Sequence, residues 1–346
     1  MIHILKHVES ITQQRDRPLL ELGVASALFE VVRAREVNLF KVIYGQGMPR
    51  VERVTHVGQD GVRYVDTDFV DTIETEVIDA RAEMAACVMD RQIVRRHDLD
   101  RGVYVHCFPV DVDRRVLGVL ELVTPHVLDD EQMGTAEGFL GLYRNYLNIL
   151  DYSERDTLTG MLNRKTFDDN LGKLLAGLTP SGGNGSSLPA RRAVECGRHW
   201  LAVIDVDHFK RINDHYGHLY GDEVLLLLAR IMQQSFRHQD KLFRFGGEEF
   251  VVVLRSSGPG ETATALERFR TAVDTHVFPQ IGHVTVSIGY TPIRANDTIP
   301  DIVGRADEAL YFAKDHGRNQ TVSHDDLLAK GLIAPRERPQ GDVELF

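Results

Sequence analysis

Three carboxylates in the second half of the chain have the spacing of a cation-binding site. Asp205 ends the apolar run 200–205, and Glu248 and Glu249 follow the pair Gly246–Gly247. The glycines permit a tight hairpin turn and close approach of a ligand. Clustered carboxylates repel one another unless a cation binds, and hard oxygen ligands favour Mg²⁺. Mg²⁺ between these groups and a nucleoside triphosphate would support nucleotidyl transfer; taken alone, the motif also fits a plain hairpin with solvated glutamates.

These side chains need a sheet that brings a strand end and a hairpin together. Apolar runs and helical spacings after residue 199 predict, in order, a strand at 200–205, a helix at 221–236, strands at 242–245 and 250–254, a helix at 261–275, a strand at 283–289 and a helix at 301–316. This is the βαββαβ order of a ferredoxin-like, palm-type α+β domain. Its first and third strands are neighbours, so Glu248 and Glu249 are expected to face Asp205.

The first half of the chain is predicted to form another α+β domain with an antiparallel sheet. The pattern indicates helices at 19–35 and 71–89, and strands at 37–44, 51–56, 103–110 and 116–123, with a turn at 111–115. A length of 346 residues allows about two domains, each with its own core.

A helix is expected to run from about Asp129 past Leu150 and to end near 156–160. Its side chains Leu140, Tyr143, Leu147 and Leu150 follow the spacing of an a/d seam. The seam either packs on its own domain or pairs with a second copy as a parallel dimeric connector. The Gly-, Ser- and Pro-rich segment 178–197 is expected to be a surface loop.

Composition and charge exclude several classes of protein. The chain is 43% hydrophobic and 26% charged, unlike collagen or a disordered tail protein. Its net charge of -11 argues against non-specific nucleic-acid binding, which needs a basic surface. The cysteines, Cys87, Cys107 and Cys196, are widely separated and odd in number, so a reducing, cytoplasmic setting is expected. No signal peptide is recognised, and no apolar run reaches the roughly 18 residues of a membrane span.

The second half resembles the GGDEF family of diguanylate cyclases from Asp156 to about Gln320. The signature loop is 246–250 (GGEEF), an accepted active variant. The other family motifs stand in order at 156–164 (DTLTGMLNR), 205–210 (DVDHFK), 213–214 (ND), 217–218 (GH), 221–222 (GD) and 314–319 (KDHGRN). Met161, where the family usually has Leu, and the long segment 178–197 are departures that leave the motif residues intact.

The resemblance implies that two GTP molecules, one in each half-site of a homodimer, become cyclic di-GMP and two pyrophosphates. Mg²⁺, with Mn²⁺ as an alternative, would be held by Asp205, the Val206 carbonyl and Glu248. Glu249 would support a second metal ion or help to activate the ribose 3′-hydroxyl. The GTP-binding residues implied are His208 and Phe209 through their backbone N–H groups, Lys210, Lys314 and Arg318 through positive charge, Gly246 and Gly247 in the turn, and Asn213 and Asp222 at guanine, with Lys210 also counted as catalytic.

Some of these roles have a chemical basis or an alternative. An Asn amide both donates and accepts, and the Asp222 carboxylate can accept from guanine N1–H and N2–H, which favours guanine over adenine. Lys314 and Arg318 are four residues apart, so they share a helix face or its end, and could instead cap that helix.

A second site is implied by Arg237 and Asp240, an RxxD motif with five residues between it and Gly246. It resembles the family's inhibitory product site, with Arg268 as a third member. The planar fork of arginine binds phosphate and stacks on guanine. Feedback inhibition by cyclic di-GMP is therefore expected, although an ordinary Arg–Asp surface pair would look the same.

Neighbouring motif residues are expected to be structural. Asp156, Asn163 and Arg164 are interpreted as the junction that docks the connecting helix, and Arg244 is assigned no role.

Residues 19–128 resemble a GAF-type sensory domain, most clearly at 108–122 (FPVDVDRRVLGVLEL), and a PAS-like domain is the competitor. No ligand is predicted, because His106, Cys107 and Cys87 form no ligand-spaced cluster and are expected to be packing residues. A dimerisation module without a ligand is equally open. The expected organisation is a GAF-like sensory or dimerisation domain at 1–128, a connecting signalling helix at 129–155, the cyclase domain at 156–325 and a C-terminal tail at 326–346.

Three functions are compared. The first is a regulated diguanylate cyclase, the second a catalytically silent receptor that binds cyclic di-GMP through Arg237 and Asp240, and the third a cyclase that makes an adenine-containing dinucleotide. The intact signature loop favours the first over the second, and Asp222 favours it over the third.

Overall fold

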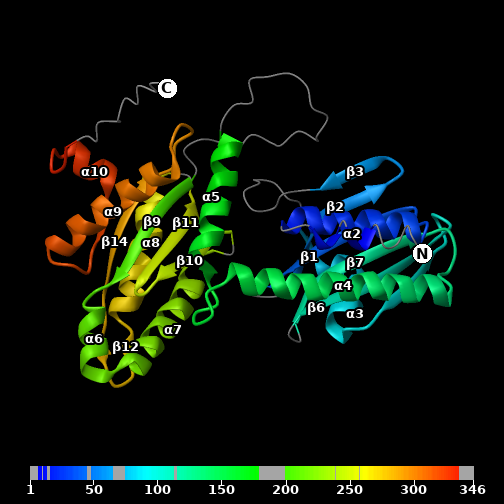
Figure 1. Cartoon of the computed structure of the whole chain (residues 1–346), viewed down its shortest axis with the longest axis horizontal. Coiled ribbons are helices and arrows are strands. Elements are labelled where there is room, and N and C mark those ends of the chain that lie inside the picture. Colours follow the sequence, from blue (N-terminus) through cyan, green and yellow to red (C-terminus); the bar gives the residue numbers. More distant parts are fainter. Residues whose placement is uncertain are drawn as a thin grey trace. The chain divides into compact units, whose positions relative to one another are not determined.

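The computed structural model describes residues 7–9, 11–13, 16–44, 48–64, 75–112, 115–178, 199–237, 239–256 and 258–334. The described residues form two compact units, one up to Glu154 and one from Arg155 onward (Figure 1). Each unit has its own sheet, so the mixed α+β class expected from the sequence is confirmed. Cys196 and most of the predicted loop 178–197 and tail 326–346 lie outside the described residues. None of the described helices is both long and apolar enough to cross a membrane.

The first unit is a largely antiparallel sheet with helices on both faces. Its strand order is β3-β2-β1-β7-β6-β5, with the short β4 paired to β2. Helices α2 and α4 pack on one face, and α3 lies against the other. The elements are α2 (Arg17–Val31), β1 (Glu36–Ile43), β2 (Arg50–Gly58), β3 (Gly61–Tyr64), β4 (Thr75–Val77), the 3₁₀ turn η1 (Ile78–Ala80), α3 (Ala82–Asp90), β5 (Val94–Asp98), β6 (Val103–Val112), β7 (Arg115–Thr124) and α4 (Asp130–Glu154).

Several predictions for this unit were wrong in part. The helix predicted at 71–89 is confined to α3, because the segment that begins at Thr75, with β-branched residues at 75 and 77, extends and pairs with β2; residues 71–74 lie outside the described part. The helix predicted at 19–35 ends at Val31, and Arg33 then takes a left-handed conformation. Strands β3 and β5 were not predicted, because edge strands such as Val94–Asp98 are polar and exposed and lack alternation.

The seam on α4 packs on its own unit. Leu140, Tyr143, Leu147 and Leu150 are all buried in the core that α4 shares with α2. The Tyr143 hydroxyl donates to Glu21 of α2 at 3.0 Å, and burial raises the pKa of Tyr143. Of the two alternatives for this seam, the structure therefore supports packing within the unit.

His106, Cys87 and Cys107 of this unit are buried, as expected for packing residues. Cys87 and Cys107 are free and buried, and burial raises the pKa of Cys87 to about 12. His106 is also buried, and desolvation lowers its pKa to about 4.

The second unit has the strand order β15-β14-β9-β11-β10-β8. The inner strands β14-β9-β11-β10 pair antiparallel in the order of a βαββαβ sheet, and β8 and β15 add parallel edges. The elements are β8 (Leu162–Asn163), α5 (Arg164–Leu178), β9 (His199–Val206), α6 (Phe209–Tyr216), α7 (His218–Ser235), β10 (Lys241–Gly246), β11 (Glu249–Arg255), α8 (Pro259–Asp274), β12 (Val277–Phe278), β13 (Gly282–His283), β14 (Val286–Pro292), α9 (Ile299–Asp315), β15 (Thr321–Ser323) and α10 (His324–Ala329). The strand predicted at 283–289 is shifted, since β14 begins at Val286, and α6 was not predicted as a separate helix.

Close packing of α9 on the sheet positions one residue of the site. A Cβ atom at Gly289 of β14 would overlap the backbone of Ala306 and Leu310 in α9, so glycine is needed for this approach. Helix α9 therefore lies close against β14 and β9, and its last turn carries Lys314 to the end of β9.

Candidate active site and inhibitory pocket

The three carboxylates gather at one end of the central strands. Asp205 of β9 is 4% exposed and pairs in register with Glu249 of β11 on one side and Ser287 of β14 on the other. Directly opposed residues of an antiparallel pair have Cβ atoms about 4.5–5.5 Å apart. The Val206 amide donates to the Glu248 carbonyl oxygen at 3.4 Å, which holds the hairpin turn over the strand end. The arrangement expected from the βαββαβ order is thus present.

The cluster carries more negative charge than its one adjacent lysine balances. Lys314 Nζ lies 2.8 Å from Asp205 Oδ2. Burial raises the pKa of Asp205, and the charge of Glu249 adds to this rise, whereas Lys314 opposes it. Burial and the Asp205 charge also raise the pKa of Glu248. Ionising Asp205 and Glu248 therefore costs free energy that further positive charge would offset.

The oxygen donors fit a metal ion that arrives with a polyphosphate. The candidates are the carboxylates of Asp205 and Glu248 and the Val206 carbonyl, all hard ligands. Within the described part of the chain, no group of three or more His, Cys, Asp or Glu side chains could by itself hold a metal ion. Mg²⁺ usually takes one or two carboxylates and completes its shell with water and substrate phosphates. The donor set is consistent with that mode of binding.

The turn after β9 presents backbone donors beside the carboxylates. His208 has φ 59° and precedes α6 as its N-cap, with Phe209 buried at the first helical position. Lys210 follows in the first turn and is exposed. Free N–H groups at a helix N-terminus and in a left-handed turn attract anions. His208, Phe209 and Lys210 are thus placed for the phosphate role that the resemblance implies.

Helices α6 and α7 bring the predicted guanine-binding residues near one another. The Asn213 amide oxygen of α6 lies where a Cβ of Gly221 in α7 would be, so glycine is required there. Asp222, the next residue, is exposed on α7. An amide and a carboxylate on two contacting helices can together offer the donor and acceptors that guanine needs.

Asp207 organises the site and was missed by the sequence analysis. Its buried carboxylate accepts hydrogen bonds from the hydroxyls of Thr285 and Ser287, both at 2.7 Å, and from the backbone N–H of Asn319 at 3.0 Å. These bonds join the end of β9 to β14 and to the segment that carries Arg318. Arg318 has φ 61° and follows the end of α9, so it does not share a regular helix face with Lys314. The available signal in the sequence was the spacing of Asp207 two residues after Asp205, because side chains two apart along a strand point to the same face.

Arg244, to which the sequence analysis gave no role, joins two predicted motifs. Its Nη1 lies 2.8 Å from Asp156 Oδ1, and its Nη2 donates to the Gly247 carbonyl at 2.9 Å. Burial alone would raise the pKa of Asp156, but the hydrogen bonds from Arg244 and Thr159 hold it below its ordinary value. The glycine turn is thereby fixed to the turn that follows Arg155.

The other junction residues also have structural contacts. Asn163 Oδ1 accepts from the Thr166 amide at 3.0 Å in the first turn of α5, and the Arg164 guanidinium lies 5.4 Å from the centre of the Phe245 ring.

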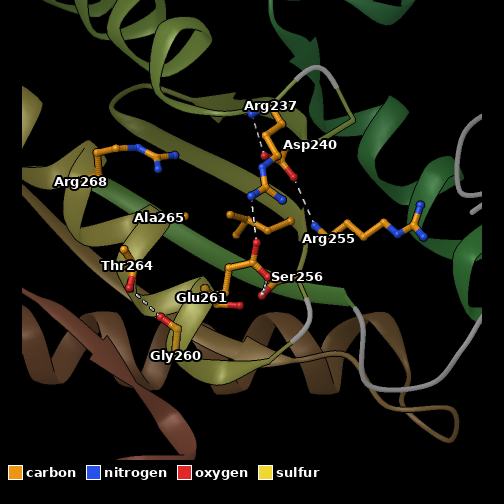
Figure 2. A pocket seen from close by; sticks show the side chains of 11 residues that line it. Arg237, Asp240, Arg255, Ser256, Gly260, Glu261, Thr264, Ala265 and Arg268 are labelled. Atoms are coloured by element: carbon orange, nitrogen blue, oxygen red, sulfur yellow. Dashed lines mark hydrogen bonds and ion pairs between the residues drawn. The ribbon is translucent and has the colours of Figure 1, made fainter.

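The predicted inhibitory residues line a single cavity of about 310 Å³ (Figure 2). Arg237 comes from the top of the view and Arg268 from the left, and the Arg237 guanidinium pairs with Glu261 at 2.9 Å. Arg268 Nη2 donates to the Ser235 carbonyl at 2.6 Å. The buried Asp240 carboxylate accepts from the backbone amides of Arg237 and Arg255, at 2.8 and 3.2 Å, and so fixes the loop that presents Arg237.

Comparison with known proteins identifies the family. Residues 153–320 match the family model for the GGDEF domain of diguanylate cyclases. Diguanylate cyclase DgcP of Pseudomonas aeruginosa is 39% identical over 168 residues, which are 48% of this chain and 23% of that protein. Diguanylate cyclase DgcM of Escherichia coli is 32% identical over 226 residues, 64% of this chain and 48% of that protein. The chain thus spans half or less of the length of these two relatives.

A further relative and a solved structure extend the comparison. Diguanylate cyclase DgcZ of Escherichia coli is 30% identical over 217 residues, which cover 60% of this chain and 68% of that protein. The coiled coil and GGDEF domain of DgcB from Caulobacter crescentus, solved in complex with c-di-GMP, aligns with a TM-score of 0.48 and 27% identity over 56% of this chain and 98% of that one. On the family model and these relatives, the chain belongs to the GGDEF diguanylate cyclase family.

Proposed function

We propose that this protein is a diguanylate cyclase that condenses two GTP molecules into cyclic di-GMP and two pyrophosphates. The observation that carries the proposal is the carboxylate cluster of Asp205, Glu248 and Glu249, with Lys314 against it. In each of two steps, a ribose 3′-oxygen attacks the α-phosphorus of the other GTP. A P–O bond forms, the bond between the α-phosphorus and the bridging oxygen breaks, and pyrophosphate leaves.

A bound Mg²⁺, with Mn²⁺ as the alternative, would supply Lewis-acid stabilisation of the charge that develops on the phosphate. Asp205, the Val206 carbonyl and Glu248 would hold it. Glu249 lies opposite Asp205 and is exposed, so its carboxylate is placed to take the proton from the 3′-hydroxyl or to support a second ion.

The remaining residues of the site would bind and orient GTP. The backbone amides of His208 and Phe209 and the charges of Lys210, Lys314 and Arg318 would neutralise the triphosphate. The turn glycines Gly246 and Gly247 leave room for it, since an added Cβ at either would meet nothing within 4 Å, and both have positive φ. Asn213 and Asp222 would read the guanine edge.

The reaction requires a homodimer, because each half-site binds one GTP. We infer that the exposed face of α4 contributes to the pairing of two copies. Ile149 is 62% exposed and Tyr152 is 78% exposed, and they continue the a/d spacing of Leu142 and Asn145. The double variant Ile149→Glu, Tyr152→Glu is expected to sediment as a monomer. An unchanged dimer would reject this face.

The first unit is proposed to be a GAF-like sensory or dimerisation domain at 1–128, with PAS-like as the alternative, followed by the connecting helix 129–155, the cyclase domain 156–325 and the tail 326–346. Support comes from its antiparallel sheet between helices and from a row of linked polar side chains that crosses this sheet. Asn38 donates to Glu121 at 2.8 Å, His56 shares a hydrogen bond of 2.7 Å with Asn38, and Arg81 lies 3.6 Å from Glu121. Burial raises the pKa of Glu121. A change in this row of linked polar side chains would be a means of signal input.

Product feedback at the second site is part of the proposal. Arg237, Arg268 and Asp240 line one cavity, and two guanidinium groups can bind the phosphates of cyclic di-GMP and stack on its guanines. An ordinary surface pair of Arg237 with Asp240 is not what the structure contains, since the Arg237 side chain pairs with Glu261 instead.

The proposal is tested by incubating the purified protein with GTP and Mg²⁺ and identifying the product by chromatography and mass. Cyclic di-GMP from the wild type but not from Glu248→Ala is expected. If no product forms even after bound nucleotide is removed and Arg237 is replaced, the cyclase assignment for the isolated chain is wrong. Binding of cyclic di-GMP by such a protein would indicate the silent receptor.

A further inference from the structure

Glu261 occupies the inhibitory cavity beside its principal arginine. It stands in the first turn of α8, and its Oε1 lies 2.9 Å from Arg237 Nη2. Its other oxygen, Oε2, accepts from the Ser256 hydroxyl at 3.4 Å. Figure 2 shows the Arg237 guanidinium directed to this carboxylate, with Arg268 to the left of the pair. The N–H groups that a phosphate would use are therefore partly engaged by the protein's own carboxylate.

We propose that Glu261 is an internal competitor for the phosphate of the inhibitory ligand. This inference rests on the proposed inhibitory site and concerns how that site is set. Cyclic di-GMP must displace the Glu261 carboxylate from Arg237 before its phosphate can take the same donors. Glu261 thereby raises the product concentration at which inhibition begins, and at low product levels the cavity holds the Glu261 carboxylate and no product.

The pair has the properties of a displaceable contact. The side chains of Arg237 and Glu261 are 61% and 37% exposed, and exposed ion pairs contribute little stability. Once released, the carboxylate stays in the first turn of α8, where the helix dipole favours a negative charge. It also remains close enough to repel a bound phosphate. Both effects weaken ligand binding, so removing the charge is expected to tighten it by roughly threefold to tenfold.

The test is calorimetric titration of cyclic di-GMP into the full chain and its variants. Glu261→Gln is expected to bind about threefold to tenfold more tightly than the wild type. Glu261→Asp keeps the charge but shortens its reach to Arg237, and should fall between them. The matched control is Glu267→Gln, which removes the same charge from α8 and breaks the 2.7 Å pair with Arg270 outside the cavity. Its affinity should equal that of the wild type.

The outcomes separate this inference from the proposed site. If Arg237→Ala abolishes binding but Glu261→Gln binds like the wild type, the inhibitory site stands and the competitor role is overturned. A similar gain in Glu267→Gln would also overturn it, because the effect would then be one of overall charge. If the wild type binds no cyclic di-GMP, or binds it equally well without Arg237, the site and the inference both fail. Thermal unfolding of each variant confirms that it is folded.

Discussion

The proposed catalytic edge and the proposed inhibitory cavity of the second unit have opposite excesses of charge. At the end of β9, Asp205 gathers with two glutamates, and Lys314 is the lysine against them. In the cavity, the charges of Arg237, Arg255 and Arg268 outnumber those of Asp240 and Glu261 by one, and Glu261 is paired with Arg237. Each site thus holds an internal counter-ion with the same sign of charge as its proposed ligand. Lys314 stands in the site proposed for a metal cation, and Glu261 stands in the cavity proposed for phosphate.

The two counter-ions, Lys314 and Glu261, are similarly exposed at 32% and 37%, but the side chains they pair with differ strongly in burial. The Asp205 side chain is 6% exposed, so its charge is poorly screened and its pKa is raised by burial. The Arg237–Glu261 pair is open to solvent and weak. The comparison indicates that the catalytic edge places charge where it costs stability and supports chemistry. In the proposed inhibitory cavity, the contact is weak and exchangeable, which suits the adjustment of affinity that we propose for Glu261.

The largest expected effect is at the catalytic edge. Asp205→Asn should lower the rate of cyclic di-GMP formation by about 10³-fold or more, because it removes a charged oxygen donor from the site of phosphoryl transfer. Asp168→Asn, an exposed position on α5, is the matched control and should retain the wild-type rate. The measurement is the rate of cyclic di-GMP formation by both variants and the wild type. Near-normal activity of Asp205→Asn would remove the basis of the comparison.

Asp207→Asn tests whether the network behind the catalytic edge positions it. The amide has one oxygen where the carboxylate has two that accept three hydrogen bonds, so at least one donor loses its partner. We expect activity to fall by about 10–100-fold and the free energy of unfolding to fall by about 1–3 kcal/mol. Kinetics and denaturant unfolding would show both. A loss of stability with no loss of activity would make Asp207 purely structural.

Arg237→Ala tests whether the cavity binds cyclic di-GMP and transmits product inhibition. Removing its charge-assisted hydrogen bonds to phosphate should weaken cyclic di-GMP binding by about tenfold or more. Late-stage product accumulation should rise, while the initial rate in the absence of product stays the same. Progress curves at several starting concentrations of product provide the measurement. Equal inhibition of the variant and the wild type would show that product inhibition does not act through Arg237 and this cavity.

The smallest effect expected is on the dependence of stability on pH without metal. Burial raises the folded-state pKa of Asp205 above its unfolded value of 3.8, so ionisation opposes folding. This penalty is complete above the raised pKa, decreases as the pH falls through it and is absent below the unfolded value. Asp205→Asn should therefore unfold at a higher temperature than the wild type at neutral pH. The difference should shrink as the pH is lowered; a constant or reversed difference would contradict the argument.

Features carried by local pattern could be predicted from the sequence. The apolar run before Asp205 and the glycine turn before Glu248 gave the strand and the hairpin, and the βαββαβ order placed the two side by side. Contacts that depend on strand register could not be predicted in this way. Asp207 meets Thr285 only because of how β9 and β14 pair, and Arg244 reaches a turn 88 residues away.

The sequence also could not predict which element packs against an apolar helix face. The Leu140–Leu150 seam suits a second helix of any origin, and only the tertiary structure shows that α2 covers it. A short polar edge strand such as β5 carries too little apolar alternation to be recognised, because its hydrogen bonds to β6 stabilise it. The assignment of Glu261 likewise depends on where α8 begins relative to Arg237.

The most direct test of the central claim is the stoichiometry of the reaction. Purified protein, GTP and Mg²⁺ are incubated, and cyclic di-GMP and pyrophosphate are both quantified over time. The account predicts two pyrophosphates for each cyclic di-GMP, and neither product with Asp205→Asn or when the divalent ion is chelated. Release of inorganic phosphate or pyrophosphate without a cyclic dinucleotide, or turnover that survives loss of the Asp205 carboxylate, would contradict it.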